Sequence, residues 1–449
     1  MSQKKSLIQK SLYIMAWILG TMAILLLLTI TWVDWEDYRE KDYYTETMSD
    51  LQELQFNSSA SDTWMVGWST INATPEQPTA LVGYRPRGNY EFVLDSSYVK
   101  TLVLGNGKKN VAILNYELLI VHPYLSKRIQ AAIRNENLPI DFVYFTATHT
   151  HSGHGGYIPG LMGKLAFGGF DETIVSLLEQ KTLEGIKSAL ATQDTAVLHY
   201  QRANADSLVA NRFKSEDPTD PFVRQLVFEK RNGQKGTFLT YSAHPTILSS
   251  KYMGLSGDYP FYFNKALEQN GYVFSLFAAG TVGSHRPVAN GNQPEDVKQY
   301  ALDLNNNLPN QSEKPKLINK AKILTAYLPI ELREVHYRLS DNIRLRPWIF
   351  NWAFGETNAH FDILVLGNTL LIGSSGEISG VFYDKWEKKA AELGLNLIIT
   401  SFNGGYIGYI TPDKYYQEKY HEVRDMNWFG PYNGAYFDEI IGALIEKQQ

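Results

Sequence analysis

Three of the chain's ten histidines fall within six residues, at the point where an apolar run ends. His149, His151 and His154 occur in the segment FVYFTATHTHSGHGGY, residues 142–157. The aromatic and β-branched residues 142–145 predict a buried strand. The glycines that follow predict a loop in which backbone can approach a ligand closely. Neutral imidazole suits zinc, and zinc sites place ligands on rigid elements beside an open position. We therefore expect a zinc site here rather than a loop of solvated histidines.

The histidine spacing also resembles the His-x-His-x-Asp-His motif of the metallo-β-lactamase fold. His149, His151 and His154 have that spacing, but Gly153 stands where the motif has its aspartate. The chain also lacks the early glycine-rich hairpin region of that fold. We therefore favour a different family, and the sequence assigns no role to His154.

The longer string ATHTHSGHGG resembles the zinc motif of the neutral, non-lysosomal ceramidases, amidohydrolases that cleave the N-acyl bond of ceramide. Other segments resemble this family in the expected order over most of residues 64–440. They are VGWSTINATP (66–75), GYRPRG (83–88), ANRF (210–213), SAHPTIL (242–248), GEISG (376–380), NGGYIGYITPDKYY (403–416) and FGPYNGAYF (429–437). The resemblance covers the N-terminal catalytic domain only, without the immunoglobulin-like domain that follows it in the family's larger members.

The resemblance implies a zinc site with four protein ligands. His149 and His244 are the implied imidazole ligands, Glu377 is the carboxylate ligand and Tyr409 is an unusual phenolate ligand. Tyr406 competes with Tyr409 for the fourth place. Two histidines and one carboxylate would leave zinc open for water.

The same resemblance implies residues that act beside the metal. His151 resembles the family's catalytic histidine, a general acid or base, and imidazole titrates near neutrality. Arg212 resembles the family's active-site arginine, and a guanidinium can hold a carboxylate or a developing oxyanion. Asp258 is expected to cap the helix that begins at Tyr259, or to orient a histidine.

Two departures from the family pattern bear on the substrate. The family has Gly-Asp-Val-Ser-Pro-Asn, but residues 283–288 read GSHRPV, so Arg286 occupies the position of the active-site serine. Arg286 would then stabilise charge or bind an anionic substrate group. His421 stands where the family has an active-site tyrosine before a glutamate, and Tyr420 would replace that tyrosine after a one-residue slip. Both changes lie where the leaving or polar part of the substrate would bind. They therefore argue against ceramide as the substrate more than they argue against hydrolysis as the reaction.

The composition agrees with a large enzyme domain. The chain has 449 residues, of which 44% are hydrophobic and 13% aromatic. Its net charge is −5, and no basic run follows the N-terminus, so nucleic acid is not an expected partner. There are no cysteines, which excludes disulfides and thiol catalysis. A small-molecule or lipid substrate is the expected partner, and the sequence does not predict the oligomeric state.

The N-terminus predicts a membrane anchor. Residues 11–33 contain no charged residue, a length that can span the hydrocarbon core. Lysines precede this span and acidic residues follow it, which places residues 1–10 in the cytoplasm as a short tail. Residues 34–62 are expected to form a stalk, and residues 63–449 the hydrolase domain, facing the periplasm or the exterior of a cell inner membrane. A cleaved signal peptide is the alternative, but its apolar core would be shorter.

Strand-like and helix-like segments alternate along the chain, which predicts an α/β fold with a mixed sheet flanked by helices. Expected strands are 98–104, 110–114, 142–146, 197–200, 238–241, 273–277, 363–366, 369–372 and 396–400. Expected helices are 123–134, 173–191, 259–270, 295–308, 379–393 and 435–446.

The sequence as a whole predicts a membrane-anchored zinc hydrolase that cleaves an amide bond in an N-acyl lipid-like substrate. Hydrolysis of a non-lipid amide or ester is one alternative. A binding protein that keeps zinc without turnover is another, although retention of His151 argues against it.

Overall fold

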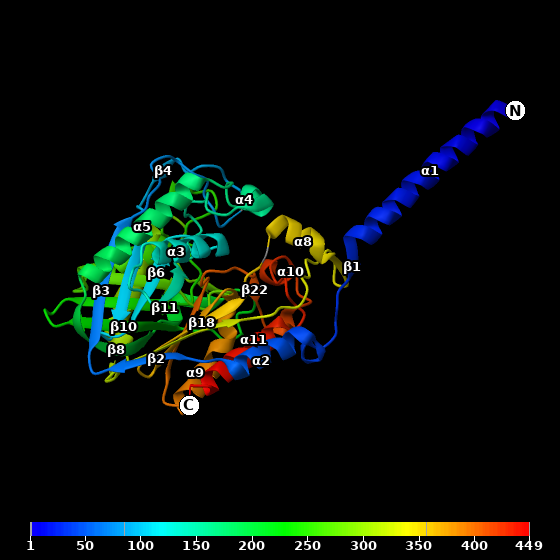
Figure 1. Ribbon diagram of the computed structural model, residues 1–449. Helices are drawn as coiled ribbons and strands as arrows, with labels where there is room; N and C mark the ends of the chain where they lie inside the picture. The colour runs from blue at the N-terminus through cyan, green and yellow to red at the C-terminus, as the bar shows by residue number, and fades with distance from the viewer. Residues whose placement is uncertain (1, 85, 356, 449) are drawn as a thin grey trace.

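Two mixed β-sheets pack against each other, with helices outside both of them (Figure 1). The structure is a computed structural model that describes residues 2–84, 86–355 and 357–448. This arrangement confirms the predicted α/β class with mixed sheets flanked by helices.

The larger sheet has nine strands. Eight follow the order β13-β11-β10-β8-β3-β5-β6-β7, and β15 pairs with β8 beside them. β11 is parallel to β13 and β6 is parallel to β7, while the remaining neighbours are antiparallel. The strands are β3 Trp64–Asn72, β5 Tyr98–Gly105, β6 Asn110–Tyr116, β7 Phe142–Ala147, β8 Asp194–Asn204, β10 Phe222–Lys230, β11 Lys235–Tyr241, β13 Phe274–Ala279 and β15 Lys316–Leu317.

The smaller sheet has five strands in the order β2-β16-β18-β19-β21. Only the β19–β21 pair of this sheet is parallel. The strands are β2 Asn57–Ser61, β16 Ala321–Pro329, β18 His360–Leu366, β19 Thr369–Ser374 and β21 Asn396–Ser401.

Alternating side chains on these strands build separate cores. Leu102 and Leu104 on β5 face a core shared with Leu364 of the smaller sheet, while Val103 faces the helices outside. On β18, Leu364 likewise faces the core between the two sheets, whereas Ile363 faces the core under the helices outside the smaller sheet. Successive side chains on a strand point to opposite faces, so apolar residues at every position bury both faces of both sheets.

Helices cover the outer face of each sheet. The larger sheet is covered by α3 Pro123–Asn135, α5 Glu172–Ala191, α6 Asp258–Gln269 and α7 Pro294–Gln311. The smaller sheet is covered by α2 Asp42–Glu53, α9 Tyr383–Glu392 and α11 Asn433–Glu446.

Short elements complete the body. They are β4 Phe92–Val93, α4 Gly160–Ala166, β9 Val209–Asn211, β12 Gly254–Leu255, β14 His285–Pro287, β17 Ile343–Leu345, α8 Pro347–Phe354, β20 Glu377–Ile378, β22 Tyr409–Ile410 and α10 His421–Arg424, with single 3-10 turns at Tyr38–Glu40, Asp206–Leu208, Gly380–Phe382 and Asp413–Tyr415. Three short sheets pair β4 with β12, β9 with β14, and β20 with β22.

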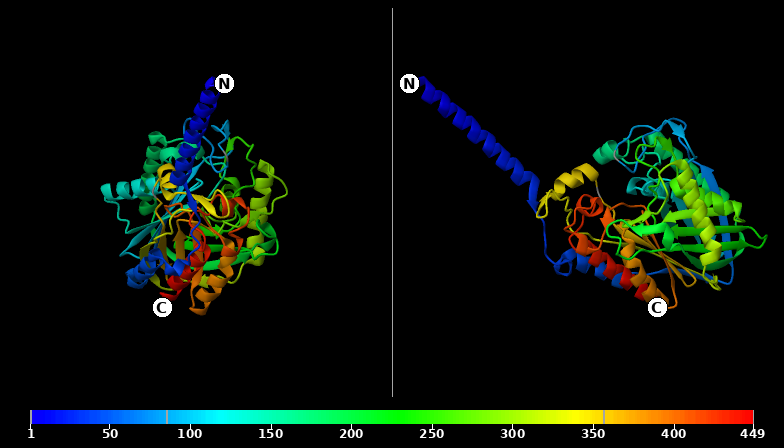
Figure 2. Two further views of the ribbon diagram at one scale, coloured as in Figure 1. Left: turned by 90° about the vertical axis from the view of Figure 1, so that its right-hand side faces the viewer. Right: turned by 180° about the vertical axis from the view of Figure 1, so that it is seen from behind.

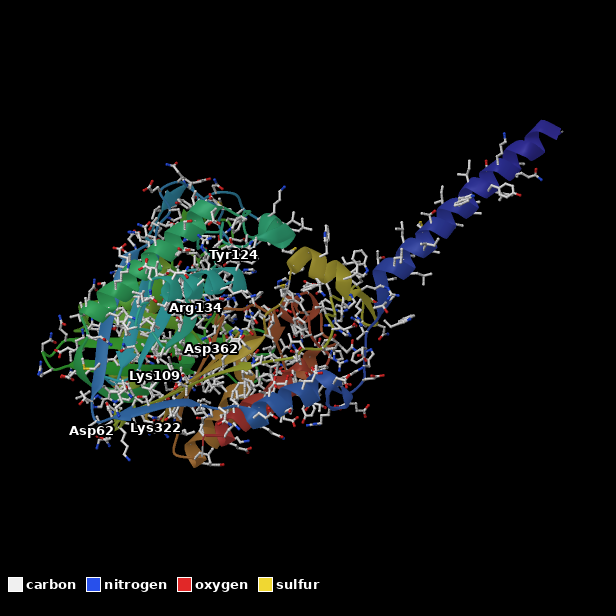
Figure 3. All side chains as sticks on the ribbon, viewed as in Figure 1. Asp62, Lys109, Tyr124, Arg134, Lys322 and Asp362 are labelled. Atoms are coloured by element: carbon white, nitrogen blue, oxygen red, sulfur yellow. The ribbon has the colours of Figure 1, made fainter. Side chains whose placement is uncertain are left out.

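The N-terminal helix α1, Ser2–Thr29, projects away from the body, and its side chains at residues 8–28 are exposed (Figures 1 and 3). Its segment Ile8–Thr29 is long and apolar enough to cross a membrane, and none of it is buried. The helix ends at Thr29, four residues before the end of the uncharged span. The next three residues form β1, Ile30–Trp32, which pairs with β17.

The segment expected to be a stalk packs against the body instead. Tyr38 and Leu51 are buried in the core outside the smaller sheet, and β2 forms the edge of that sheet through its pairing with β16. The polar and acidic residues that suggested a stalk lie on exposed positions of α2, while Thr47 and Leu51 face inward. A narrow buried face on an otherwise polar helix explains why composition alone misled the expectation.

Candidate metal centre

The carboxyl ends of two strands of the larger sheet bring two histidines together. His149 follows β7 and His244 follows β11, which stand far apart in the strand order. The sheet curls so that its edge strands β7 and β13 approach each other, and the Asn115 side-chain amide on β6 donates to the Phe277 carbonyl on β13 at 2.9 Å. This curl places both strand ends at one site.

Three imidazoles meet at that site through their Nε2 atoms. His149 Nε2 lies 3.0 Å from His244 Nε2 and 3.3 Å from His151 Nε2. His151 Nε2 lies 2.8 Å from His244 Nε2. The three side chains form a group that could hold a metal ion. His151, expected to act beside the metal, therefore lies as close to the centre as the two expected ligands.

The second ring nitrogens of His149 and His244 indicate which nitrogen is free for a metal. Nδ1 of His149 lies 2.7 Å from the Leu119 carbonyl, and Nδ1 of His244 lies 3.3 Å from the Val282 carbonyl. A carbonyl only accepts, so the neutral rings carry their hydrogen on Nδ1 and direct an Nε2 lone pair inward. Two such lone pairs repel each other at 3.0 Å unless a cation lies between them. The donor set therefore fits a metal that binds imidazole.

The electrostatics of the site favour the neutral forms of His151 and His244. Burial, with Arg212 close by, lowers the pKa of His244 well below its ordinary value. Burial and the neighbouring His149 do the same to the pKa of His151. His149 also adopts a left-handed backbone conformation with φ of 64°. Such strain in a residue other than glycine is typical of positions held in place by function.

Glu377 places a carboxylate against the histidines. Its Oε1 lies 3.6 Å from His149 Nε2 and 3.5 Å from His244 Nδ1. This oxygen is buried and has no hydrogen-bond partner among the described residues. Arg212 Nη2 lies 3.9 Å away, too far for a hydrogen bond. A buried carboxylate oxygen without a donor is costly unless a cation binds it more closely. Its partner oxygen Oε2 accepts a hydrogen bond of 3.3 Å from the Tyr406 hydroxyl.

The two candidate tyrosines both lie beside Glu377. Tyr409 pairs with Glu377 in the short parallel ladder of β20 and β22. Its hydroxyl accepts a hydrogen bond of 3.1 Å from Arg212 Nη2, whereas the Tyr406 hydroxyl is bonded to Glu377. Burial and the nearby Glu377 carboxylate raise the pKa of both phenols well above the ordinary value, against the opposing charge of Arg212. The two tyrosines therefore differ in their hydrogen-bond partners, because only the Tyr409 hydroxyl accepts from Arg212.

Arg212 enters the site after β9 and is largely buried. Its Nη2 donates to the Gly283 carbonyl at 3.0 Å, and its backbone N–H donates to the Ser284 carbonyl at 2.9 Å. Its Nε lies 3.0 Å from Oε1 of Glu422, and both side chains are mostly buried. The structure thus brings Arg212 together with Tyr409 and Glu377, as well as with Glu422.

Other expected site residues lie apart from the histidines. Arg286 is exposed on β14, and its side chain bonds only to the Pro287 carbonyl among the described residues, at 3.5 Å. His421 is exposed and pairs with Asp425 at 2.8 Å. The Tyr420 hydroxyl donates to the Phe213 carbonyl at 2.8 Å, so Tyr420 supports the residue after Arg212.

Asp258 and His154 have structural contacts. The Asp258 carboxylate accepts from the backbone N–H of Tyr259 at 2.7 Å and of Leu248 at 3.0 Å. The helix α6 begins at Asp258 itself, with Gly257 as its N-cap, so the expectation that Asp258 caps a helix from Tyr259 was wrong. The bond from Leu248 instead fixes the loop after His244. His154 is fully buried, and burial lowers its pKa to about 4.

Residues outside the predicted set also shape the site. Arg87 Nη2 donates to the His151 carbonyl at 2.6 Å, and the Tyr84 ring lies 5.0 Å from the His151 ring. Both tyrosine and arginine occur in the segment GYRPRG, whose resemblance to the family was the available signal. Glu422 had a weaker signal, because in the family pattern it is only the glutamate that follows the position of the active-site tyrosine.

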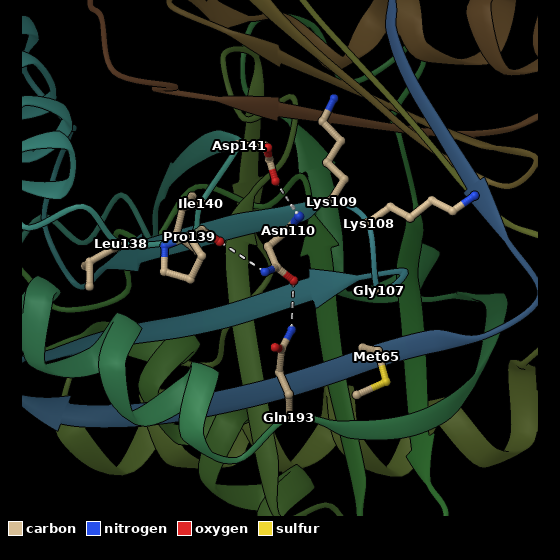
Figure 4. Close-up of a pocket in the computed structure, with 10 residues that line it drawn as sticks. All are labelled: Met65, Gly107, Lys108, Lys109, Asn110, Leu138, Pro139, Ile140, Asp141 and Gln193. Atoms are coloured by element: carbon tan, nitrogen blue, oxygen red, sulfur yellow. Dashed lines mark hydrogen bonds between the residues drawn. The ribbon is translucent and has the colours of Figure 1, made fainter.

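A polar hollow on the surface lies at the opposite end of the strands (Figure 4). Its lining includes Asn110 at the start of β6 and Asp141 just before β7. The histidines follow the other end of β7, and ligands in α/β sheets bind beyond the carboxyl ends of strands. We therefore assign the functional site to the histidine group and not to this hollow.

No protein-family model and no curated protein matches this chain in sequence. Solved structures that share its fold include two ceramidases. One is described as a crystal structure analysis of neutral ceramidase from Pseudomonas aeruginosa, with a TM-score of 0.70 and 16% identity over 86% of this chain and 75% of that chain. The other is a ceramidase complexed with C2, with a TM-score of 0.68 and 16% identity over 86% of this chain and 76% of that chain. The chain therefore has a ceramidase-like fold that brings together three histidines able to hold a metal ion.

Proposed function

We propose that this protein is a membrane-anchored, zinc-dependent hydrolase that cleaves the amide bond of an N-acyl lipid-like substrate. The observation that carries the proposal is the convergence of three histidine Nε2 atoms beside Oε1 of Glu377, an oxygen that accepts no hydrogen bond from the described residues. Its occurrence in a ceramidase-like fold supports a hydrolytic role.

His149, His244 and Glu377 would hold the zinc ion, with Tyr409 as the fourth ligand. When bound, zinc would polarise a carbonyl and lower the pKa of a coordinated water to about 7. Imidazole nitrogen and carboxylate oxygen are ligands that zinc accepts. The Nδ1 contacts of both histidines with backbone carbonyls would keep their rings oriented toward the ion.

His151 would move the proton. Its Nε2 faces the centre, and its ring is only partly buried, unlike those of His149 and His244. The imidazole would accept a proton from the attacking water and deliver it to the leaving amine. Hydrogen bonding of its carbonyl to Arg87 would hold this residue in place.

Arg212 would bind the oxygen that becomes negative as the amide is attacked. A guanidinium preorganised by a buried carboxylate stabilises developing charge without reorganisation during the reaction. Glu422 and the Gly283 carbonyl supply that preorganisation here.

The helix α1 would anchor the protein as a single span of the cell inner membrane. Lys4, Lys5 and Lys10 precede the apolar segment, while Asp34 and Glu36 follow it. This asymmetry favours a cytoplasmic N-terminus and a catalytic domain in the periplasm or outside the cell. A protease added to intact spheroplasts should degrade the domain. Protection of the domain there, with degradation only after lysis, would reverse the proposed orientation.

The activity test uses the full chain in vesicles with a panel of N-acyl lipids, non-lipid amides and esters. We expect release of fatty acid from N-acyl lipids, loss of release with a chelator and recovery with zinc. The double variant His149→Ala, His244→Ala is the matched inactive protein. Hydrolysis confined to non-lipid substrates would replace the lipid assignment, and zinc binding without hydrolysis across the panel would indicate a binding protein.

A further inference from the structure

The short helix α8 presents large aromatic side chains to solvent beside the end of α1. Trp348 is 56% exposed and Trp352 is 70% exposed. Nearby, Trp32 on β1 is 72% exposed and Leu339 is 54% exposed. Scattered exposed apolar residues are ordinary, but several tryptophans in adjoining segments mark a contact surface.

The inner face of α8 is firmly packed, so the exposed tryptophans do not result from a loose helix. Phe350 is 2% exposed and stacks on Phe354 with ring centroids 4.0 Å apart. Both rings contact Trp428, at 5.1 and 4.9 Å. One face of α8 is therefore part of the core, and Trp348 and Trp352 lie on the outward side.

Hydrogen bonds tie the start of α8 to the end of α1. The Arg346 backbone N–H donates to the Thr29 carbonyl at 2.8 Å, and its Nε donates to the Leu27 carbonyl at 2.8 Å. Trp348 Nε1 donates to the Leu28 carbonyl at 3.0 Å. The last carbonyls of a helix lack intrahelical partners, and a cation there also interacts favourably with the helix dipole. These contacts, with the β1–β17 pair, fix α8 next to the point where α1 meets the body.

The helix α8 lies on the side of the body from which α1 extends. In Figure 1 and in the right-hand view of Figure 2, α1 extends away from the body, and α8 lies at its base. The helix α4 packs against α8 on the same side, and its Leu165 is 55% exposed. A bilayer that contains Ile8–Thr29, about 33 Å of helix, would therefore have its near surface at β1 and α8.

We propose that Trp348 and Trp352 of α8, together with Trp32, form a contact surface for the interfacial region of the lipid bilayer. The proposal rests on the anchoring of α1 stated under "Proposed function". Tryptophan is enriched at membrane–water interfaces because its ring is apolar and its indole N–H is polar. A single helix leaves a domain free to rotate and tilt, whereas a second contact beside it holds the domain in one orientation toward the lipid surface.

The chain contains no cysteine, so single cysteines can report on this surface without a background. We would compare Trp352→Cys and Asn351→Cys on α8 with Leu19→Cys in α1 and Lys322→Cys on β16. Lys322 is exposed and lies at the end of the body away from α1 (Figure 3). Asn351→Cys keeps both Trp348 and Trp352. Its label therefore reports on the same surface without the loss of a tryptophan side chain, which Trp352→Cys entails.

Each full-length variant would carry an environment-sensitive fluorophore in phosphatidylethanolamine–phosphatidylglycerol vesicles. We expect at least a twofold stronger quenching of labels at 351 and 352 by lipids spin-labelled near the headgroup than by aqueous iodide. The label at 19 should respond only to lipid-borne quenchers, and the label at 322 only to iodide. If 351 and 352 behave like 322 while 19 reports lipid, the contact surface is wrong and the anchor stands. If 19 itself responds to iodide, the anchor fails and the contact surface fails with it.

Discussion

The guanidinium Nε of Arg212 lies 3.0 Å from Oε1 of Glu422, and the pair is mostly shielded from solvent. The other end of the same guanidinium donates to the Tyr409 hydroxyl at 3.1 Å. Glu422 thus holds Arg212 from the side away from Tyr409. This relationship joins α10 to the candidate metal centre and makes Glu422 a positioning residue for Arg212.

Replacing Glu422 by glutamine should lower kcat/KM about tenfold, because an ion pair that orients Arg212 becomes a neutral contact of equal size. Zinc content should be unchanged, and Glu422→Asp should recover part of the activity. Steady-state kinetics with the best substrate of the panel would measure the effect. Glu418→Gln is the matched control, since Glu418 pairs with Lys214 at 3.7 Å and both are exposed. Equal activity of the two variants would show that Glu422 does not position Arg212.

The two tyrosines beside Glu377 can be separated by matched substitutions. Tyr409→Phe should weaken zinc binding at least tenfold, because the substitution removes the oxygen of the proposed fourth ligand and its hydrogen bond from Arg212. Tyr406→Phe should have a smaller effect, since it removes only a hydrogen bond to Glu377 Oε2. Competition with a chromophoric chelator gives both dissociation constants. The reverse order would identify Tyr406 as the fourth ligand.

Arg286 offers a test of substrate charge. It follows His285, whose carbonyl is 3.4 Å from the His244 backbone nitrogen, and its exposed side chain is free to meet an approaching substrate. Arg286→Ser should lower kcat/KM for anionic N-acyl substrates by up to about fivefold, the range of an exposed charge contact. Neutral ceramide should be affected less. An unchanged ratio between anionic and neutral substrates would place Arg286 outside substrate recognition.

Asp95 should make the free energy of unfolding depend on pH. Burial raises its pKa to about 7, against the opposing hydrogen bonds from the Gly257 N–H and the Ser256 hydroxyl. The folded protein then keeps a proton that the unfolded chain releases near pH 4. The free energy of unfolding therefore falls as pH rises from about 4 to about 7.

Asp95→Asn mimics the protonated form and should remove this part of the decline. Chemical denaturation at pH 5 and pH 8 would measure it, with Asp62→Asn as a control at an exposed carboxylate. An equal decline in the Asp95→Asn and unmodified proteins would show that Asp95 is ionised in the fold throughout this range.

Much of the fold follows from local patterns in the sequence. The strands β5, β6, β7, β19 and β21 and the helices α3 and α5 lie within two residues of their predicted bounds, because continuous apolar runs and helical periodicity mark them. The strand β10 was missed. Its Arg224 is buried in an ion pair with Asp220 at 2.8 Å, a partner that a linear pattern does not show.

The candidate site was only partly predictable. The histidines and Glu377 were found through motifs, but their meeting depends on the curl of the larger sheet, which no local pattern encodes. The equivalence of His151 with the two expected ligands, and the contact of Glu422 with Arg212, likewise arise from the tertiary fold. The packing of residues 34–62 against the body depends on a partner surface of the smaller sheet that lies hundreds of residues later.

The most direct test of the account is the zinc content of the purified full chain, measured by elemental analysis. We predict about one zinc per chain in the unmodified protein and in His199→Gln, a histidine on β8 outside the cluster. The double variant His149→Ala, His244→Ala should retain none while keeping its fold by circular dichroism. Full zinc occupancy in that double variant would contradict the assignment of the metal centre.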